Sequence, residues 1–461
     1  MVSIPKQVHF IGIGGAGMSA LANILLTLGY QVSGSDLVAT HVTQRLEALG
    51  GKCYLGHDAN NLQDARLVVI SSAINGDNPE LAKAREKGIP VIHRAELLAW
   101  LMSRQKGVAV AGAHGKTTTT SMLALTLEKN GLDPTIIIGG ELNDIGGNAK
   151  LGRGEYVVAE SDESDGSFLK LKPLAAIVTN IEDDHLDHYG SLENIKAAFR
   201  AFLGSLPGHG RAVVCLDDPN IREVVAGLNV PLVTYGLDHR ADYTLGEIVL
   251  QGRQTKGEVY YRGSRLGVLE LFVPGRHNLL NALAVVALAR WLGLEFAGIA
   301  GALKEFRGVG RRFQFIGEAG GVRVFDDYAH HPTEIKTTLQ AARTLKPSRV
   351  VAFFQPHRYT RTALLHERFG EAFRDADLIF MTEIYSAGEP PIEGVSTRLI
   401  IDAVEKYDGR PVVYFPGIDE AVRHLADLVV PGDLVLTLGA GNIWTAGKKL
   451  LAQLEKKRAG T

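Results

Sequence analysis

Two glycine-rich stretches of the chain have the spacing of loops that bind nucleotide phosphates. The first is HFIGIGGAGMSALA, in which Gly12, Gly14 and Gly17 follow an apolar run and precede a helix-like segment. Glycines at this spacing permit a tight turn and let a diphosphate approach the N–H groups of a helix N-terminus. Asp36 follows the next apolar run, where a carboxylate accepts hydrogen bonds from a ribose. The motif alone is compatible with NAD, with a UDP-sugar, or with a close-packed turn.

The second stretch, AGAHGKTTTT, lies about a hundred residues later between a strand-like run and a helix-like segment. Lys116 can reach the β- and γ-phosphates of a bound nucleotide, and the Thr117 hydroxyl can ligate Mg²⁺. The spacing is shorter than in the usual phosphate loop, because Val110 occupies the first glycine position and Gly112 comes two residues later. We predict that this loop binds ATP, with the Lys116 side chain exposed.

Carboxylates and a histidine follow the next two strand-like runs. Glu160 ends the run YVVAE, where its carboxylate could meet a Mg²⁺ ion held by Thr117. The acidic residues that crowd the same turn are interpreted mostly as a solvated loop, and they are Asp162, Glu163 and Asp165. His185 lies beyond the run AAIVTN, at the sheet edge where α/β proteins bind ligands. It is interpreted either as a metal ligand or as a structural histidine.

The elements that must position these residues belong to an ordinary globular protein. The chain has 461 residues, of which 46% are hydrophobic and 22% charged, and about three domains are expected at this length. A net charge of −2 argues against a nucleic-acid binder. Two cysteines are too few for a disulfide framework or a thiolate metal site, which suggests a reducing cytoplasm. Neither a signal peptide nor a membrane span is expected.

Short apolar runs alternate with helix-like segments almost throughout, which predicts α/β domains with mostly parallel sheets. The exception is 210–275, where polar and apolar residues alternate between turn glycines, and we predict an antiparallel region there. Composition changes near 102–107 and 306–314 mark the expected boundaries. The predicted domains are 1–104, 105–312 and 313–461.

The chain resembles the Mur ligases of peptidoglycan synthesis along essentially its whole length. The motifs that carry this resemblance are, in order, HFIGIGGAGMSALA, AGAHGKTTTT, AESDESDGSFL, NIEDDHLDHYG, GRHNLLNALAVVALA, GVGRRFQ, DDYAHHPTEI and FQPHRYTRT. The combination of GKTTT, HNxxNA and DDYxHHP is highly specific. One departure is Ala113, where the family often has threonine. Because the backbone N–H groups remain, ATP binding is expected to survive.

The resemblance implies three domains: an N-terminal Rossmann-like domain for UDP, a central P-loop ATPase domain with a small antiparallel region, and a C-terminal Rossmann-like domain for an amino acid. It also implies a reaction in which ATP and Mg²⁺ activate the carboxylate of UDP-N-acetylmuramate as an acyl phosphate, which L-alanine then attacks. The implied protein is cytoplasmic, a monomer or weak homodimer, with no nucleic-acid or membrane partner. The alternatives are a ligase that joins a preformed peptide to the same sugar, an NAD-dependent oxidoreductase, and a nucleotide sensor without catalysis.

The resemblance also assigns individual residues. The catalytic residues are expected to be Lys116, His185 and His330. Those at ATP are Gly112, Gly115, Lys116, Thr117, Thr118, His277, Asn278, Asn281, Arg312 and Asp327. Those at the UDP-sugar are Gly14, Gly15, Ala16, Gly17, Met18, Asp36, Ser71 and Ser72. Those near the reacting groups and the amino acid are Tyr328, His330, Arg358 and Arg361. The metal ligands are Thr117, Glu160 and His185.

Several of these residues also have a plainer interpretation. The asparagines of HNLLN suit an adenine edge, or they cap a buried helix that begins near His277. Arg311 and Arg312 neutralise phosphate charge, or they are solvated. Arg358 and Arg361 would share a face if their segment is helical, and would then clamp a carboxylate. A metal site at the adjacent histidines of DDYAHHP is rejected, because adjacent side chains usually point apart.

Overall fold

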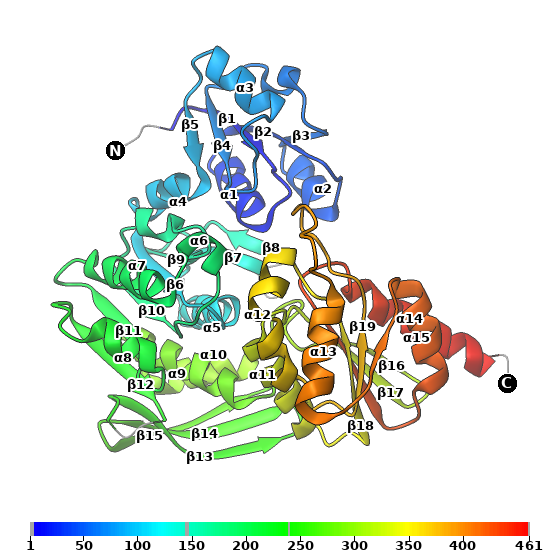
Figure 1. Ribbon diagram of the computed structural model, residues 1–461. Coiled ribbons are helices and arrows are strands. Elements are labelled where there is room, and N and C mark those ends of the chain that lie inside the picture. The colour runs from blue at the N-terminus through cyan, green and yellow to red at the C-terminus, as the bar shows by residue number, and fades with distance from the viewer. Residues whose placement is uncertain (1–3, 143–146, 238–239, 460–461) are drawn as a thin grey trace. The chain divides into compact units, whose positions relative to one another are not determined.

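The structure is a computed structural model that describes residues 4–142, 147–237 and 240–459. Within these residues the chain forms three β-sheets with helices packed against them (Figure 1). Most of the strand pairs are parallel, which confirms the predicted α/β class. Two compact units comprise residues 1–246, 258–268 and 280–303, and residues 247–257, 269–279 and 304–461.

The first sheet is parallel, with the strand order β3-β2-β1-β4-β5. Its strands are β1 (Gln7–Ile11), β2 (Gln31–Asp36), β3 (Lys52–Leu55), β4 (Leu67–Ile70) and β5 (Val91–His93). Its helices are α1 (Ala16–Thr27), α2 (His41–Ala48), η1 (Ala59–Leu62), α3 (Pro79–Glu86) and α4 (Arg94–Met102). The apolar strand β1 is buried at the centre, with β2 beside it on one side and β4 on the other, so the chain reverses its direction across the sheet at β1. The turns after β1, β2 and β4 therefore open at one edge, where such sheets bind ligands.

The second sheet has ten strands in the order β15-β14-β13-β12-β11-β10-β6-β9-β7-β8. Its strands are β6 (Lys106–Ala111), β7 (Thr135–Leu142), β8 (Gly147–Lys150), β9 (Tyr156–Glu160), β10 (Ala175–Val178), β11 (Arg211–Cys215), β12 (Leu232–Gly236), β13 (Tyr243–Gln251), β14 (Gln254–Tyr261) and β15 (Ser264–Leu271). Its helices are α5 (Lys116–Lys129), η3 (Ser167–Lys170), α6 (Leu186–Tyr189), α7 (Leu192–Gly204), α8 (Pro219–Val225), α9 (Arg276–Trp291) and α10 (Phe296–Glu305). Strand β6 pairs in parallel with β10 and with β9. The candidate residues Lys116 and His185 follow β6 and β10, and Glu160 ends β9. Because these strands are parallel, the segments that follow all three begin at the same edge of the sheet.

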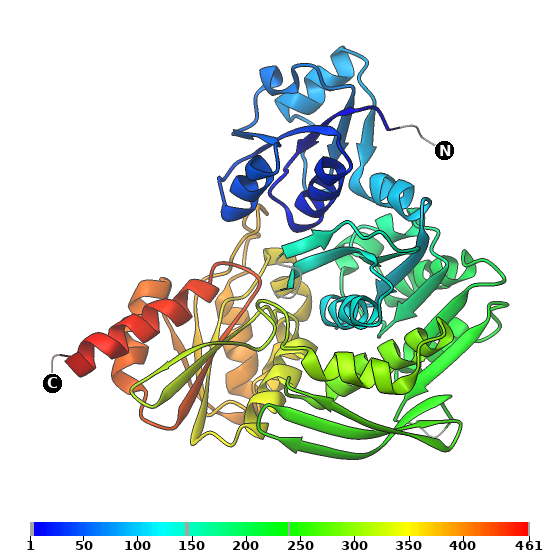
Figure 2. The same ribbon diagram turned by 180° about the vertical axis from the view of Figure 1, so that it is seen from behind.

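The predicted antiparallel region is correct only in its second half. Strands β11 and β12 extend the parallel sheet, because each is a short apolar run and α8 provides the crossover between them. Within the predicted region, β13, β14 and β15 are joined by two-residue turns, which makes them successive hairpins. They are the long green strands in Figure 2.

The third sheet has the order β16-β17-β21-β18-β19-β20, in which only the edge strand β16 is antiparallel. Its strands are β16 (Gln314–Ala319), β17 (Val322–Asp327), β18 (Arg349–Phe354), β19 (Leu378–Met381), β20 (Val412–Tyr414) and β21 (Asp433–Leu438). Its helices are α11 (Pro332–Thr344), α12 (Tyr359–Ala372), α13 (Thr397–Asp408), α14 (Ile418–Leu428) and α15 (Trp444–Ala459). A hydrophobic core covers each face of this sheet. Strands β17 and β18 flank β21, so the turns that follow them open at the same edge.

The predicted domain boundaries stay predictions. The boundary at 104/105 lies between α4 and β6, and the boundary at 312/313 lies between α10 and β16. Among the described residues, we find no helix whose length and hydropathy would let it span a lipid bilayer.

Candidate functional site

The loop between β6 and α5 needs glycine at two positions. Gly112 has φ +133°, and a Cβ there would lie 2.2 Å from Thr179 Oγ1. Gly115, at the start of α5, has φ +81°, and its Cβ would lie 2.9 Å from Oδ1 of Asn281. Both the left-handed backbone and the close packing exclude a side chain. The loop therefore leads a closely packed backbone directly to the N-terminus of α5.

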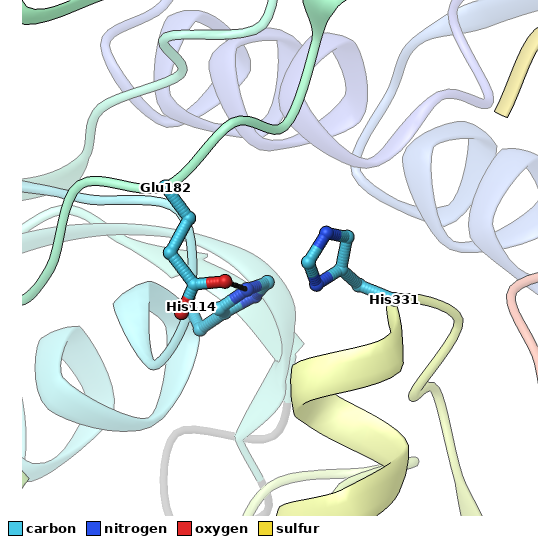
Figure 3. A group of neighbouring side chains, drawn as sticks. All are labelled: His114, Glu182 and His331. Carbon is cyan, nitrogen blue, oxygen red and sulfur yellow. Dashed lines mark ion pairs between the residues drawn. The ribbon is translucent and has the colours of Figure 1, made fainter. Parts of the chain in front are cut away.

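The end of β10 holds this loop in place. The backbone N–H of His114 donates to Oδ1 of Asn180 at 2.8 Å, and Thr179 Oγ1 donates to the His114 carbonyl at 2.6 Å. The His114 ring lies 3.4 Å from the carboxylate of Glu182, the ion pair drawn in Figure 3. Asn180 is the last residue of the run AAIVTN and lies two residues beyond β10. Its contact with the loop could not be predicted from the sequence, because that contact depends on which strands are neighbours.

Lys116 is partly buried, contrary to the expectation that its side chain is exposed. Its side chain is 15% exposed, and Nζ donates to the Gly112 carbonyl at 2.6 Å and to Oε1 of Glu163 at 2.7 Å. Burial alone would lower the pKa of Lys116, but nearby carboxylates, first that of Glu163, outweigh burial and raise it. The lysine is thus charged and aimed at the loop. Thr118, the next residue but one on α5, is half-buried.

The prediction of a mostly solvated acidic loop is wrong for Glu163 and Asp165. The Glu163 side chain is only 4% exposed, and burial raises its pKa to about 7. Asp165 lies 3.5 Å from Nε2 of His93, and Asp162 forms a 2.5 Å ion pair with Arg94. Each carboxylate has a basic partner from another element. The sequence does not reveal these partners, because they are far away along the chain.

Two of the three predicted metal ligands lie together. Thr117 Oγ1 donates to Oε1 of Glu160 at 3.0 Å, and the Gly139 N–H donates to Oε2 of the same carboxylate at 2.8 Å. The third, His185, lies with Nε2 3.5 Å from Asp184 and 3.8 Å from Glu163. A hydroxyl and a carboxylate at the end of β9 therefore form a pair of hard oxygen donors beside the loop.

The first glycine-rich turn is braced by the end of β2. The Gly12 N–H donates to the Ser35 carbonyl at 2.8 Å, and the Gly14 N–H donates to Oδ2 of Asp36 at 2.9 Å. Asp36, predicted to bind a ribose, thus holds the turn in this structure. A Cβ on Gly17 would lie 3.2 Å from Nη1 of Arg94, which sequence reasoning missed. The ribose contact stays a prediction.

The other residues expected at the first site differ in exposure. Gly15 and Ala16 are exposed at the start of α1, whereas the Met18 side chain is buried. Any contact of Met18 with a ligand would therefore use its backbone. Ser71 and Ser72 follow β4 and thus lie at the same sheet edge as the glycine-rich turn.

In the third sheet, β17 ends at Asp327, a buried carboxylate that accepts two backbone N–H groups. Oδ2 accepts from Phe313 and Oδ1 from Ala329, each at 2.7 Å. Burial raises the pKa of Asp327 to about 6. Arg311 pairs with Asp326 at 3.0 Å, which makes it a structural cation rather than a solvated one.

The turn after β17 gathers aromatic and basic side chains. The guanidinium of Arg312 lies 5.2 Å from the ring centroid of Tyr328 and 3.7 Å from the carboxylate of Glu334. His330 Nδ1 lies 2.9 Å from the Tyr328 carbonyl. His331, at the start of α11 in Figure 3, accepts from a backbone N–H of its own helix through Nδ1.

Arg358 and Arg361 are not a pair on one helical face. Helix α12 begins at Tyr359, so Arg358 precedes it with φ +70° and contacts Glu389 at 3.4 Å. Arg361 is 9% exposed and lies 3.3 Å from Nδ1 of His357. The helical spacing argument therefore fails, although Arg358 ends the turn after β18 and Arg361 lies in the first turn of α12.

Helix α9 begins at Arg276, one residue before the predicted start. Burial lowers the pKa of His277 to about 4, so its imidazole is neutral near pH 7. Asn278 Nδ2 donates to the Pro274 carbonyl at 2.7 Å, which ties the first turn of the helix to the segment before it. Asn281 instead packs against Gly115 of the phosphate loop.

Comparisons with known proteins agree along the whole chain. The family model described as "Mur ligase family, catalytic domain" matches residues 7–106. The model "Mur ligase middle domain" matches residues 110–289, and "Mur ligase, glutamate ligase domain" matches residues 311–441. The three matches come in the order in which the motifs were found.

Individual proteins also match over nearly their full lengths. UDP-N-acetylmuramate–L-alanine ligases from Pelotomaculum thermopropionicum and Desulforamulus reducens are 63% and 57% identical, each over 98% of both chains. Among solved structures, the UDP-N-acetylmuramate–alanine ligase of Thermotoga maritima is 33% identical with TM-score 0.83, over 99% of this chain and 100% of that one. A murein peptide ligase from Psychrobacter arcticus is 26% identical with TM-score 0.74, over 97% and 98%.

Proposed function

Because the chain belongs to the Mur ligase family, we propose that it joins L-alanine to the carboxylate of UDP-N-acetylmuramate at the expense of ATP, in peptidoglycan precursor synthesis. The observation that carries this proposal is the 63% identity to an L-alanine ligase over 98% of both chains. The phosphate loop and the first glycine-rich turn support it, because the reaction needs one site for each nucleotide.

The loop at the start of α5 is the proposed ATP site. Its N–H groups and the charge of Lys116 suit phosphate oxygens. The Thr117 hydroxyl and the Glu160 carboxylate, 3.0 Å apart, are oxygen donors of the kind that Mg²⁺ prefers, so they fit that ion. His185 is proposed to bind a second Mg²⁺ ion. When bound, ATP supplies the phosphoryl group that activates the substrate carboxylate, and Mg²⁺ screens its charge.

The residues of the chain then have distinct proposed tasks. Lys116 must exchange its contact with Glu163 for one with the nucleotide phosphates. His330 is the proposed acceptor of the proton that the amine of L-alanine must lose. Its Nδ1 proton is held by the Tyr328 carbonyl at 2.9 Å, which leaves the lone pair on Nε2. His185 is the alternative acceptor.

The remaining assignments concern recognition. We propose that Arg358 and Arg361 neutralise the carboxylate of L-alanine, and that His277, Asn278 and Asn281 lie near the adenine. Thr118, Arg312 and Asp327 are proposed at ATP, and Tyr328 beside the reacting groups. The UDP-sugar is assigned to Gly14, Gly15, Ala16, Gly17, Met18, Asp36, Ser71 and Ser72.

Phosphate release by the purified protein tests the proposal. It is measured with ATP, Mg²⁺ and UDP-N-acetylmuramate, with and without L-alanine. We expect release that depends on L-alanine, together with a product heavier by one alanyl residue. Reduction of NAD by the protein, or no phosphate release with any amino acid or peptide, would contradict it.

The likeness to the murein peptide ligase gives one further candidate. A ligase of that kind would release phosphate with a preformed peptide and not with L-alanine, so a peptide in place of L-alanine separates the two. A cytoplasmic location and a monomeric or weakly dimeric state stay predictions.

A further inference from the structure

A buried carboxylate lies behind the first glycine-rich turn. Glu80 is in the first turn of α3, and its exposed fraction is 0%. Glutamate is almost never fully buried unless its charge is paired and hydrogen-bonded. Its partners therefore indicate what the carboxylate holds in place.

Glu80 is the common acceptor of four polar groups, one from β1, one from β2 and two from η1 and its N-cap. The contacts are Ser35 Oγ to Oε2 at 2.5 Å, Asn61 Nδ2 to Oε1 at 2.6 Å, the Asp58 N–H to Oε1 at 3.2 Å, and His9 Nε2 to Oε2 at 3.3 Å. Burial alone would raise the pKa of Glu80, but hydrogen bonds, first that from His9, outweigh it and lower the pKa. An ionised carboxylate only accepts, so every one of these partners donates to it.

Ser35 connects this network to the nucleotide turn. Its side chain is held by Glu80, while its carbonyl accepts the N–H groups of Gly12 at 2.8 Å and Ile13 at 3.0 Å. The next residue, Asp36, accepts the Gly14 N–H at 2.9 Å. A shift of Ser35 would therefore move the hydrogen bonds that Ser35 and Asp36 make with the turn.

We propose that Glu80 is a positioning residue for the UDP-sugar. From behind the sheet its carboxylate fixes Ser35, and Ser35 and Asp36 fix the turn that receives the diphosphate. This inference rests on the proposed function, because it assigns UDP-N-acetylmuramate to that turn. Displacement of a binding group by about 1 Å is enough to weaken a site substantially.

A purely structural role would have different consequences. When one member of a buried charge network is removed, its former partners are left without a match, and the stability of the whole domain falls. A structural Glu80 would lower the melting temperature and reduce kcat or the affinities for all substrates together. A positioning Glu80 would raise the Kd and KM for UDP-N-acetylmuramate alone.

The test compares Glu80→Gln with the wild-type protein by calorimetric titration of UDP-N-acetylmuramate and by steady-state kinetics. Glutamine keeps the shape but presents an amide donor to groups that already donate. We expect Kd and KM for UDP-N-acetylmuramate to rise about tenfold, which corresponds to about 1.4 kcal/mol. The KM for ATP should change less than about twofold, as for a surface substitution.

Glu86→Gln is the matched control. Glu86 ends the same helix, is exposed, and forms an ion pair with Lys83 on the surface of that helix. Its substitution should leave both KM values unchanged. If Glu80→Gln does not fold, the same measurements are made on Ser35→Ala. That substitution removes one donor to Glu80 and keeps the Ser35 carbonyl, which contacts the turn.

Unchanged UDP-N-acetylmuramate binding by folded Glu80→Gln or Ser35→Ala would overturn the inference and leave the proposed function intact. A parallel rise in the KM for ATP would also overturn it. Failure of the wild-type protein to bind UDP-N-acetylmuramate would overturn the proposed function, and this inference with it.

Discussion

The ammonium nitrogen of Lys116 lies 2.7 Å from Oε1 of Glu163, a carboxylate whose side chain is only 4% exposed. The lysine that is proposed to bind ATP phosphates thus has a protein carboxyl group as its partner in this structure. Binding of the nucleotide must exchange that carboxyl group for phosphate oxygens. The positive charge of Lys116 therefore stabilises the folded phosphate loop and is also the charge that the proposed chemistry needs.

Lys116→Ala should abolish turnover. Removal of a charge that stabilises the transferring phosphoryl group typically reduces kcat on the order of 10²-fold or more. It should also lower stability by about 3 kcal/mol, because one member of a buried pair is left without its partner. Phosphate release and the thermal unfolding midpoint measure the two effects.

The double variant Lys116→Ala/Glu163→Gln separates these effects. It should recover most of the lost unfolding temperature, since no buried carboxylate remains unpaired, and it should stay inactive. Normal phosphate release by a folded Lys116→Ala protein would refute the assignment of the ATP site.

Glu160→Gln should raise the Mg²⁺ concentration that half-maximal activity requires. Glutamine keeps one oxygen that can accept from Thr117, gives up the acceptor that Gly139 uses, and removes the negative charge that favours a divalent cation. We expect an increase on the order of tenfold in a Mg²⁺ titration of phosphate release, equivalent to about 1.4 kcal/mol. Glu155→Gln is the control, because that exposed residue precedes the same strand and pairs with Lys106. Equal Mg²⁺ dependence of both variants would remove Glu160 from the metal site.

Sequence patterns predicted the nucleotide loops well because their determinants are local. The tight turns at Gly12 and Gly115 need glycine, and a strand before and a helix after each turn can be recognised from the neighbouring residues. The α/β class follows from the same alternation. The helical pairing of Arg358 with Arg361 failed because α12 begins at Tyr359, and helix starts are among the least certain features of a sequence.

The partners of buried charges could not be predicted in this way. Glu163 meets Lys116 across 47 positions, and Glu80 meets His9 across 71. These contacts depend on which strands are neighbours, and no local pattern encodes that. An acidic run such as ESDESD is the same in sequence whether it is solvated or buried.

The stability of the protein should depend on the protonation of His277. Its pKa is about 4 in the folded chain, because burial disfavours the charged ring, against about 6.5 for an exposed histidine. Between these values the unfolded chain binds more protons, so the free energy of unfolding increases as pH rises from about 4 to 6.5. The full contribution is about 3.5 kcal/mol at most, at roughly 1.4 kcal/mol for each pH unit between the two values.

This pH dependence is checked by measuring the unfolding temperatures of the wild-type protein and His277→Gln from pH 4 to pH 7. The wild-type midpoint should fall more steeply below pH 6.5 than that of the variant. His209→Gln, at an exposed histidine in the turn before β11, should follow the wild-type curve. Parallel curves for wild type and His277→Gln would show that His277 does not contribute.

Gly115→Ala should weaken ATP binding more than its backbone strain explains. Gly115 has φ +81°, and a Cβ there would lie 2.9 Å from Oδ1 of Asn281, whose side chain is 8% exposed. The new methyl group would push the phosphate loop away from α9. We expect the KM for ATP to rise on the order of tenfold, which a displacement that costs about 1.4 kcal/mol would produce.

Gly131→Ala is the control that isolates the contact with Asn281. Gly131 has nearly the same backbone angle, φ +79°, but no atom lies within 4 Å of its added Cβ. Both variants carry the strain of a left-handed alanine, about 1 kcal/mol, and so both should lose a similar part of their stability to it. Only Gly115→Ala should then change the KM for ATP, because only there does the methyl group meet a side chain that packs on the phosphate loop. Equal KM values for the two variants would show that the loop tolerates the methyl group and that Asn281 does not set its position.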